Sequence, residues 1–386
     1  MSDPHDRIPF ALPDITDAEI EAVSRAILSG WVTSGPEMVK FEEDFASHVG
    51  GQVHAVAVNS ATAGLHLALE ACGIGPGDEV IIPTWTFTAT AEVARYVGAM
   101  PVIVDVDPVT LNISLRHVER AMTPRTRAVL PVHLAGLGVD LKQLRAIVGP
   151  DVRIIEDAAH ALPTVTAGSQ IGSCEHSDAA VFSFYATKTI TTGEGGMITT
   201  RDPQLAMRAR VMRLHGIDRD AFDRYRSDKP AWFYDVVAAG FKYNLTDPAA
   251  AMGRVQLARS TAMHRRRQEI AQRYLTAFSD LPVTLPETAP PGDTHAWHLF
   301  ILRINPHGRF ERDRFIAALD DRGIGASVHF IPLHRHTIWR RSLHLTDGDY
   351  PHASEQFERV VSLPLYSSMT DAQVERVVEA VVDVLA

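Results

Sequence analysis

Between residues 53 and 200 the chain alternates short apolar segments with helical ones, and this alternation limits the possible folds more than any other feature. Helical segments such as residues 61–71 and 114–121 separate the apolar segments. The apolar segments read as strands that begin near Val53, Glu79, Val102, Ala128 and Val152. Strands connected through helices pair in parallel and carry helices on both faces. The sequence therefore predicts an α/β fold built on a mainly parallel sheet.

The second half of the chain predicts a smaller domain after a long helix. The helix begins at Asp247 and runs to about Phe278 through three arginines, 265–267, that we expect on a solvated face. Prolines and a glycine between residues 282 and 292 then interrupt regular structure. Beyond them we predict a strand at 297–304, a helix at 310–322, a strand at 326–330 and a last helix at 370–385. Residues 1–255 are expected to form a large domain, and residues 256–386 to contain the connecting helix and a small domain.

Lys188 is the residue whose surroundings point most directly to chemistry. It follows the apolar segment 181–184 and precedes a glycine-rich turn at 192–196. A lysine in such surroundings is poorly solvated, which disfavours its charged form and lowers its pKa from about 10.4. A neutral amine is what Schiff-base chemistry with an aldehyde requires. A lysine at a strand end can instead extend into water, so the neighbouring motifs must decide between the two interpretations.

Three other motifs favour a cofactor site, although each also has an ordinary structural explanation. Asp157 ends a buried strand, where ligands bind in open α/β sheets; it could pair with the pyridinium nitrogen of pyridoxal phosphate or cap a turn. Ser60, Ala61 and Thr62 lead from a strand into a helix, which makes an anion site or a simple helix cap. Trp85 follows another strand and could stack on a flat ring or pack in the core.

With these motifs in this order, the chain resembles the DegT/DnrJ/EryC1/StrS family of sugar aminotransferases, pyridoxal-phosphate enzymes of fold type I. The matching segments run nearly from end to end: 33–36, 59–69, 73–80, 104–107, 131–134, 156–160, 182–188, 193–196, 243–245, 297–300 and 328–330. The resemblance implies that Lys188 carries the cofactor and that Asp157 faces its pyridine nitrogen. The family's deoxygenating dehydratases carry histidine at the position of Lys188, which argues against that branch.

The resemblance also implies roles for other residues of the site. His160 is expected beside the phenolic oxygen of the cofactor ring, and Trp85 is expected to stack on the ring. Thr33 and His329 match positions expected near the substrate. The cofactor phosphate is expected to be held by Ser60, Ala61, Thr62 and Ser183, and by Asn244 of a neighbouring subunit, since family sites form across a homodimer.

The expected reaction moves an amino group from glutamate, which becomes 2-oxoglutarate, to a keto sugar carried on a nucleotide, in amino sugar biosynthesis for lipopolysaccharide or another glycan. Segments 31–36, 60–64, 240–245 and 295–298 resemble enzymes that aminate C4 of UDP-4-keto sugars, such as those forming UDP-4-amino-4-deoxy-L-arabinose. Segments 189–193 and 331–334 depart from that pattern, so a pentose and a 6-deoxyhexose both stay open. A C3 aminotransferase acting on a nucleotide 3-keto-6-deoxy sugar is the alternative. A regulatory protein that binds the cofactor without turnover is the alternative from a different class, and the intact Lys188 and Asp157 disfavour it.

Composition excludes several other classes of function. The net charge of −10, with no basic block, argues against nucleic acids and anionic membranes as partners. Two cysteines, Cys72 and Cys174, suit a reducing cytoplasm, and neither a signal peptide nor an apolar run that could span a membrane is present. The spacing of three histidines, His329, His334 and His336, fits no standard zinc pattern, so we expect no metal.

Overall fold

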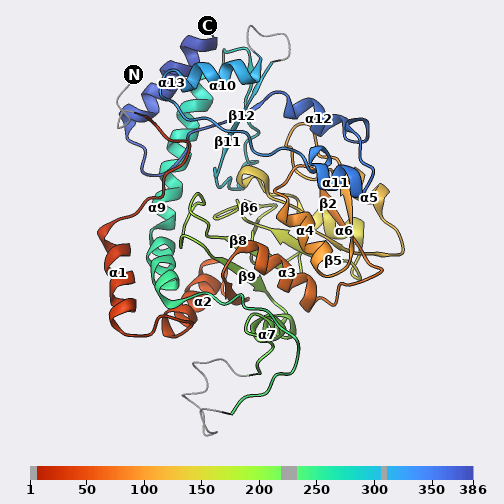
Figure 1. The fold of residues 1–386 in the computed structure, drawn as a ribbon. Helices are drawn as coiled ribbons and strands as arrows, with labels where there is room; N and C mark the ends of the chain where they lie inside the picture. Colours follow the sequence, from red (N-terminus) through yellow and green to blue (C-terminus); the bar gives the residue numbers. More distant parts are fainter. Residues whose placement is uncertain (1–6, 219–232, 306–310, 386) are drawn as a thin grey trace.

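The computed structural model describes residues 7–218, 233–305 and 311–385. A seven-stranded sheet in the order β1-β9-β8-β5-β4-β2-β3 forms its centre (Figure 1). Its strands are β1 (His54–Val58), β2 (Glu79–Pro83), β3 (Met100–Val104), β4 (Thr126–Val129), β5 (Arg153–Asp157), β8 (Ala179–Ser183) and β9 (Gly196–Thr200). Neighbours from β8 to β3 are parallel, whereas β9 is antiparallel to both β1 and β8. The predicted α/β fold with a mostly parallel sheet is confirmed.

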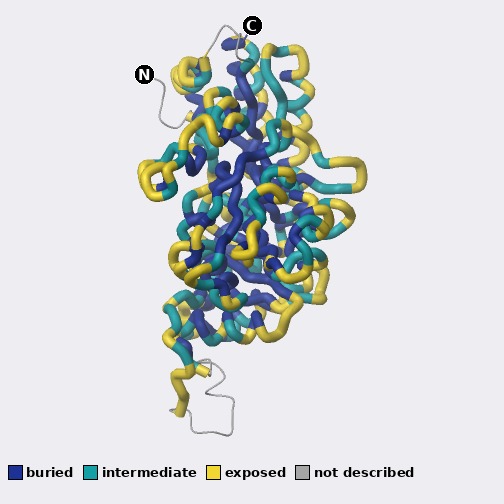
Figure 2. The backbone as a smooth tube through the Cα atoms, turned by 90° about the vertical axis from the view of Figure 1, so that its right-hand side faces the viewer, coloured by how far each residue is buried: buried dark blue, intermediate teal, exposed yellow. Residues whose placement is uncertain are grey.

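Helices cover both faces of this sheet, as the buried side chains show. On one face the core includes Val56 and Val58 with side chains of α3 (Ala61–Ala71), α4 (Ala89–Tyr96) and α7 (Pro203–Met212). On the other face it includes Ala55 and Ala57 with side chains of α2 (Pro36–His48), α5 (Leu115–Ala121), α6 (Leu141–Val148) and α9 (Asp247–Ala277). Successive strand residues point to opposite faces, so covering both faces requires the continuous apolar strands that the sequence contains. Figure 2 shows the resulting buried backbone, in dark blue, through the middle of the molecule.

Helix α9 runs from the central sheet to a second, smaller sheet, and α1 (Asp17–Leu28) packs along it (Figure 1). The second sheet is antiparallel, in the order β10 (Val283–Thr284), β11 (Phe300–Ile304), β12 (Val360–Leu363). Its core also takes side chains from the end of α9, from α10 (Arg312–Asp320) and from α13 (Asp371–Leu385). The expected domain boundary after residue 255 falls within α9, and the division into two domains stays a prediction.

The remaining short elements connect these layers. Strands β6 (Val165–Thr166) and β7 (Ser169–Gln170) form a hairpin, and a 3-10 turn, η2 (Leu134–Gly136), follows β4. Helices α11 (Thr337–Ser342) and α12 (Pro351–Phe357) bring Trp339 and Ala353 into the core of the central sheet. No helix in the described ranges is long and apolar enough to cross a membrane.

Two expectations for the second half of the chain are wrong. Residues 326–330 form no strand: Ser327 makes an isolated bridge to Ser362, which belongs to the strand β12 that the sequence analysis missed. Arg267 is buried instead of solvated, and its guanidinium donates a hydrogen bond to the backbone oxygen of Leu365 at 2.8 Å. The reason is that this part of α9 packs against the segments next to the second sheet, so Arg267 faces protein backbone at Trp297 and Leu365. Residue 310, the first of the predicted helix 310–322, lies outside the described residues, and α10 begins at Arg312.

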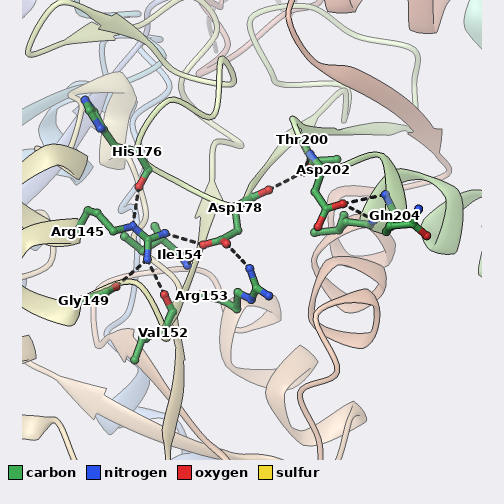
Figure 3. Close-up of polar contacts among 11 residues, drawn as sticks. Arg145, Gly149, Val152, Arg153, Ile154, His176, Asp178, Thr200, Asp202 and Gln204 are labelled. Carbon is green, nitrogen blue, oxygen red and sulfur yellow. Dashed lines mark hydrogen bonds and ion pairs between the residues drawn. The ribbon is translucent and has the colours of Figure 1, made fainter.

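The amino ends of β5 and β8 are held together by Asp178 (Figure 3). Its carboxylate accepts hydrogen bonds from Arg145 at 2.6 Å, from Arg153 at 2.7 Å and from the backbone N–H of Ile154 at 2.8 Å. Its backbone oxygen accepts one from the hydroxyl of Thr200 at 2.6 Å. These bonds join the amino ends of β5 and β8, at the far end of the two strands from their carboxyl ends.

Candidate active site

A cavity of about 490 Å³ lies at the carboxyl ends of β5 and β8. Eight residues singled out in the sequence line it, although they come from distant parts of the chain. They are Ser60, Ala61, Thr62, Asp157, His160, Ser183, Lys188 and His329. Parallel strands deliver their carboxyl ends to one edge of a sheet, which explains why residues that follow different strands meet here.

Lys188 and Asp157 give the cavity its charge. Lys188 is half-buried, and loss of solvation lowers the pKa of its amine to about 8, against the opposing negative charge of Asp157. Asp157 is buried, which raises its pKa, while hydrogen bonds from the Thr90 hydroxyl at 2.8 Å and from the Ala159 N–H at 3.2 Å favour its ionised form. The cavity therefore combines an amine that is readily neutral with a carboxylate supplied with donors.

His160 is held in one tautomer when it is neutral. Its Nδ1 accepts a hydrogen bond from the backbone N–H of Ala135 at 3.2 Å, so the ring can donate through Nε2 alone. Burial lowers its pKa well below the usual value, and the charge of Lys188 adds to this shift. The ring packs against His298 with 4.3 Å between ring centroids and against Phe330 with 5.8 Å. A buried neutral imidazole with a defined donor thus stands in the wall of the cavity.

The start of α3 forms the part of the wall suited to an anion. The N–H groups of Ala61 and Thr62 are in the first helical turn, where backbone donors have no intrahelical acceptor. The Ser60 hydroxyl caps the helix by accepting a hydrogen bond from the N–H of Ala63 at 3.1 Å. Gly196 of β9 lies directly against this turn, since a Cβ there would come within 2.8 Å of the Ala61 nitrogen. Ser183, at the end of β8, lines the same cavity.

The prediction for Trp85 is wrong in position. Trp85 is 1% exposed, packs in the core of the central sheet and is not among the residues that line the cavity. The aromatic residue of this segment that does line it is Phe87, whose side chain is 60% exposed. Residues 84–86 form bends and not a strand, so a spacing of two positions does not place the two rings on the same side, and the sequence does not say which ring reaches the cavity. Large exposed aromatic side chains are suited to stacking on a bound ring.

Thr33 and Asn244 are not brought to this cavity by their own chain. The Asn244 amide donates a hydrogen bond to the Ser34 hydroxyl at 2.7 Å, and the backbone oxygen of Thr33 accepts one from the N–H of Asp247 at 2.9 Å. Asn244 also pairs with Val58 at the end of β1 in an isolated bridge. The two residues therefore lie together beyond the edge strand of the central sheet.

His329 lines the cavity, and contacts with Ser362 and Phe10 hold its ring in place. Its Nδ1 lies 3.0 Å from the Ser362 hydroxyl, its ring stacks on Phe10 with 4.8 Å between centroids, and burial lowers its pKa to about 4. His334 lies elsewhere, between the hydroxyls of Thr84 at 2.8 Å and Ser354 at 3.1 Å. Within the described ranges, no group of three His, Cys, Asp or Glu residues is arranged to hold a metal ion.

The sequence analysis missed several residues of the wall. These are Phe10, Thr86, Phe87, Thr90, His298 and Phe330. The recurrence of threonine at every second position from Thr84 to Thr90 was the available signal for three of them. Phe10 carried no such signal, because it reaches the cavity through a tertiary contact of the first described residues with the turn after α10, where the Ile8 N–H bonds to Gly323 at 2.9 Å.

The residues present fit pyridoxal phosphate. The buried Asp157 carboxylate suits a pyridinium nitrogen, the amine of Lys188 suits an aldehyde, and the first turn of α3 suits a phosphate. The exposed ring of Phe87, which lines the same cavity, offers a flat surface. The cavity thus supplies a complementary group for each end of the cofactor.

Comparison with known proteins supports this assignment. Residues 13–382 match the DegT/DnrJ/EryC1/StrS aminotransferase family. The chain is 45% identical over 381 residues to the spore coat polysaccharide biosynthesis protein SpsC of Bacillus subtilis, which covers 98% of this chain and 97% of that protein.

Solved structures are similar over the same length. The PMP form of Spr1654 from Streptococcus pneumoniae, described as a sugar aminotransferase, is 33% identical with a TM-score of 0.90 and covers 97% of this chain and 98% of that chain. The aminotransferase TlmJ from Streptoalloteichus hindustanus is 36% identical with a TM-score of 0.86 and covers 97% of each chain. Spr1654 has also been solved in a PLP form. The chain therefore belongs to the DegT/DnrJ/EryC1/StrS family, and it is a pyridoxal-phosphate-dependent sugar aminotransferase of fold type I.

Proposed function

We propose that this enzyme transfers the amino group of glutamate to C4 of a nucleotide-linked 4-keto sugar, with UDP as the nucleotide. The observation that carries the transaminase chemistry is that the Lys188 amine and the Asp157 carboxylate share one cavity with the start of α3. The sugar substrate is supported by the relatives, among them a protein named for spore coat polysaccharide biosynthesis. The preference for C4 rests on segments 31–36, 240–245 and 295–298, which resemble enzymes acting at that carbon.

Each residue of the cavity has a distinct task in this proposal. Bound pyridoxal phosphate supplies an electron-withdrawing ring on which the amino group is exchanged. Lys188 would hold the cofactor at its carbonyl, and its readily neutral amine could take up and return a proton during the exchange. Asp157 would keep the ring nitrogen protonated, and the Nε2–H of His160 would be available to the phenolic oxygen. Ser60, Ala61, Thr62 and Ser183 would hold the phosphate.

We further propose a cytoplasmic homodimer in which Asn244 reaches the phosphate held by the other subunit and Thr33 the sugar. Support comes from their location: both residues lie together at the edge of the central sheet and outside the cavity of their own chain. His329, on the opposite wall, is proposed to contact the sugar from within the chain. Measuring the mass of the assembly in solution tests the dimer, and a monomer with full activity would rule out shared sites.

The substrate is tested with a panel of nucleotide-linked 4-keto and 3-keto sugars, supplied with glutamate. We expect an amino sugar and 2-oxoglutarate in equal amounts, with NMR placing the new amine on C4. An amine on C3 would favour the alternative enzyme. Glutamate alone should also change the absorbance of the bound cofactor, because the first half of the reaction needs no sugar. A protein whose cofactor spectrum ignores glutamate would be a passive binder, and the proposal would fail.

A further inference from the structure

A chain of hydroxyl groups ends on the Asp157 carboxylate. The Thr90 hydroxyl lies 2.8 Å from Asp157 Oδ2, and the Thr86 hydroxyl lies 2.8 Å from that of Thr90. All three side chains are buried, with exposed fractions of 0% for Thr90, 2% for Thr86 and 7% for Asp157. All three also line the cavity. Thr90 of α4 and Thr86, which precedes this helix, thus form a continuous hydrogen-bonded line to the acidic group of the site.

The direction of these hydrogen bonds follows from the groups themselves. An ionised carboxylate can only accept, so the single proton of the Thr90 hydroxyl is committed to Asp157. Thr90 can then only accept from Thr86, whose proton is committed in turn. The second carboxylate oxygen, Oδ1, accepts from the N–H of Ala159 at 3.2 Å. Each oxygen of Asp157 therefore has one protein donor, and these two donors determine the plane of the carboxylate.

The Thr90 hydroxyl has no task in building the helix that carries it. Helix α4 begins at Ala89 with Thr88 in the capping position, and no side chain caps it. Thr84, Thr86, Thr88 and Thr90 stand at every second position, but their hydroxyls have different partners. Thr84 meets His334, and Thr88 donates to Glu92 at 3.0 Å and accepts from the indole N–H of Trp339 at 3.1 Å. The contact of Thr90 with Asp157 is therefore a feature of the site and not of the segment.

We propose that Thr90, supported by Thr86, is a positioning residue that holds the Asp157 carboxylate in the orientation in which it meets the ring nitrogen of the cofactor. The inference rests on the proposed role of Asp157. Its physical basis is that a buried carboxylate needs hydrogen-bond donors to stay ionised. The N–H of Ala159 serves only Oδ1, so Oδ2 depends on the Thr90 hydroxyl. Without the Thr90 hydroxyl, Oδ2 loses its protein donor, and the carboxylate is free to rotate or to take up a proton.

The test replaces the hydroxyl without changing the shape of the side chain. Thr90→Val removes it, Thr90→Ser keeps it, and Thr88→Val makes the same change in the same segment away from the cavity. We expect Thr90→Val to raise the dissociation constant of pyridoxal phosphate about tenfold or more and to lower kcat more than it changes the KM for glutamate. Thr90→Ser should stay within about threefold of the wild type, and Thr88→Val should match it. Thr86→Val, which removes the supporting donor, should give a smaller loss than Thr90→Val.

A double-mutant cycle with Asp157→Asn shows whether Thr90 acts through Asp157. In the Asp157→Asn background, Thr90→Val should change cofactor binding by less than about threefold, because the charged acceptor has gone. Equal losses in both backgrounds, or no difference between Thr90→Val and Thr88→Val, would overturn the inference. If Thr90→Val does not fold, as judged by thermal unfolding, then Thr86→Val in the two backgrounds decides in its place. A wild-type protein that binds no pyridoxal phosphate would instead contradict the proposed function itself.

Discussion

The indole nitrogen of Trp85 donates a hydrogen bond to the backbone oxygen of His329 at 3.0 Å. Trp85 follows β2 of the central sheet, whereas His329 lies between α10 and α11, so the bond joins two distant parts of the chain, each of which contributes residues to the cavity wall. The residue expected to stack on the cofactor therefore holds these two segments together. The place beside the cavity falls to Phe87, two positions further along.

Replacing these two aromatic residues should affect two different quantities, cofactor binding for Phe87 and the free energy of unfolding for Trp85. Phe87→Ala should weaken the binding of pyridoxal phosphate by about 1 kcal/mol, the contribution of an aromatic stack, with little change in unfolding because the ring is 60% exposed. Trp85→Phe should leave cofactor binding nearly unchanged and lower the free energy of unfolding by about 1 kcal/mol through the lost hydrogen bond. Cofactor titration and urea unfolding of the cofactor-free protein measure the two quantities. Weaker cofactor binding in Trp85→Phe than in Phe87→Ala would restore the original assignment.

Attachment of the cofactor to Lys188 should depend on pH. Because the pKa of its amine is lowered to about 8, the neutral fraction, and with it the attachment rate, should rise about tenfold per pH unit below that value and level off above it. The charge of Asp157 raises the pKa of Lys188, so Asp157→Asn should move the midpoint to lower pH. Stopped-flow absorbance on mixing with pyridoxal phosphate gives the rates, with Lys188→Ala as the control without attachment. An unchanged midpoint in Asp157→Asn would mean that the two charges do not interact.

The sequence was sufficient to predict the central sheet and to single out eight residues that line the cavity, because one rule connects the two. Helix α3 was predicted with the bounds 61–71, which are those observed. Once Asp157 and Ser183 are placed at the ends of parallel strands, they must meet at the same edge of the sheet, and Lys188 follows shortly after.

The incorrect predictions concern contacts that depend on side-chain direction or on partners far away in the chain. Residues 326–330 have the apolar pattern of a strand, but only Ser327 pairs with β12, through a single bridge, and all five residues are only partly buried. Whether Trp85 or Phe87 faces the cavity depends on how the backbone turns between β2 and α4. Phe10 enters the wall from the start of the described chain, and no local pattern could have placed it there.

Buried His334 should make the protein sensitive to acid. Burial lowers its pKa from 6.5 to about 4. Below pH 6.5 this histidine is therefore protonated in the unfolded chain, whereas in the folded protein it stays neutral down to about pH 4. Stability from this residue is therefore present above pH 6.5 and is lost as the pH falls towards 4, by up to about 3 kcal/mol. His334→Gln should reduce the slope of unfolding free energy against pH in this window. Parallel curves for wild type and His334→Gln would refute the assignment.

Removing the Asp178 carboxylate should destabilise the fold without altering the chemistry of the site. Asp178→Ala leaves Arg145 and Arg153 without the acceptor that Figure 3 shows, and it frees the N–H of Ile154 at the start of β5. Because the carboxylate is 16% exposed and Arg145 is 25% exposed, the loss should be about 2 kcal/mol, between the values for surface and buried pairs. Asp202→Ala removes the nearby cap of α7, in which the Asp202 carboxylate accepts a hydrogen bond from the Gln204 N–H at 2.8 Å, and should cost about 1 kcal/mol.

Urea unfolding should show a larger loss for Asp178→Ala than for Asp202→Ala. The spectrum of bound cofactor should be unchanged in both, since Asp178 stands at the amino ends of the strands and the cavity at their carboxyl ends. A changed spectrum in Asp178→Ala alone would show that the pairing of β5 with β8 controls the geometry of the site.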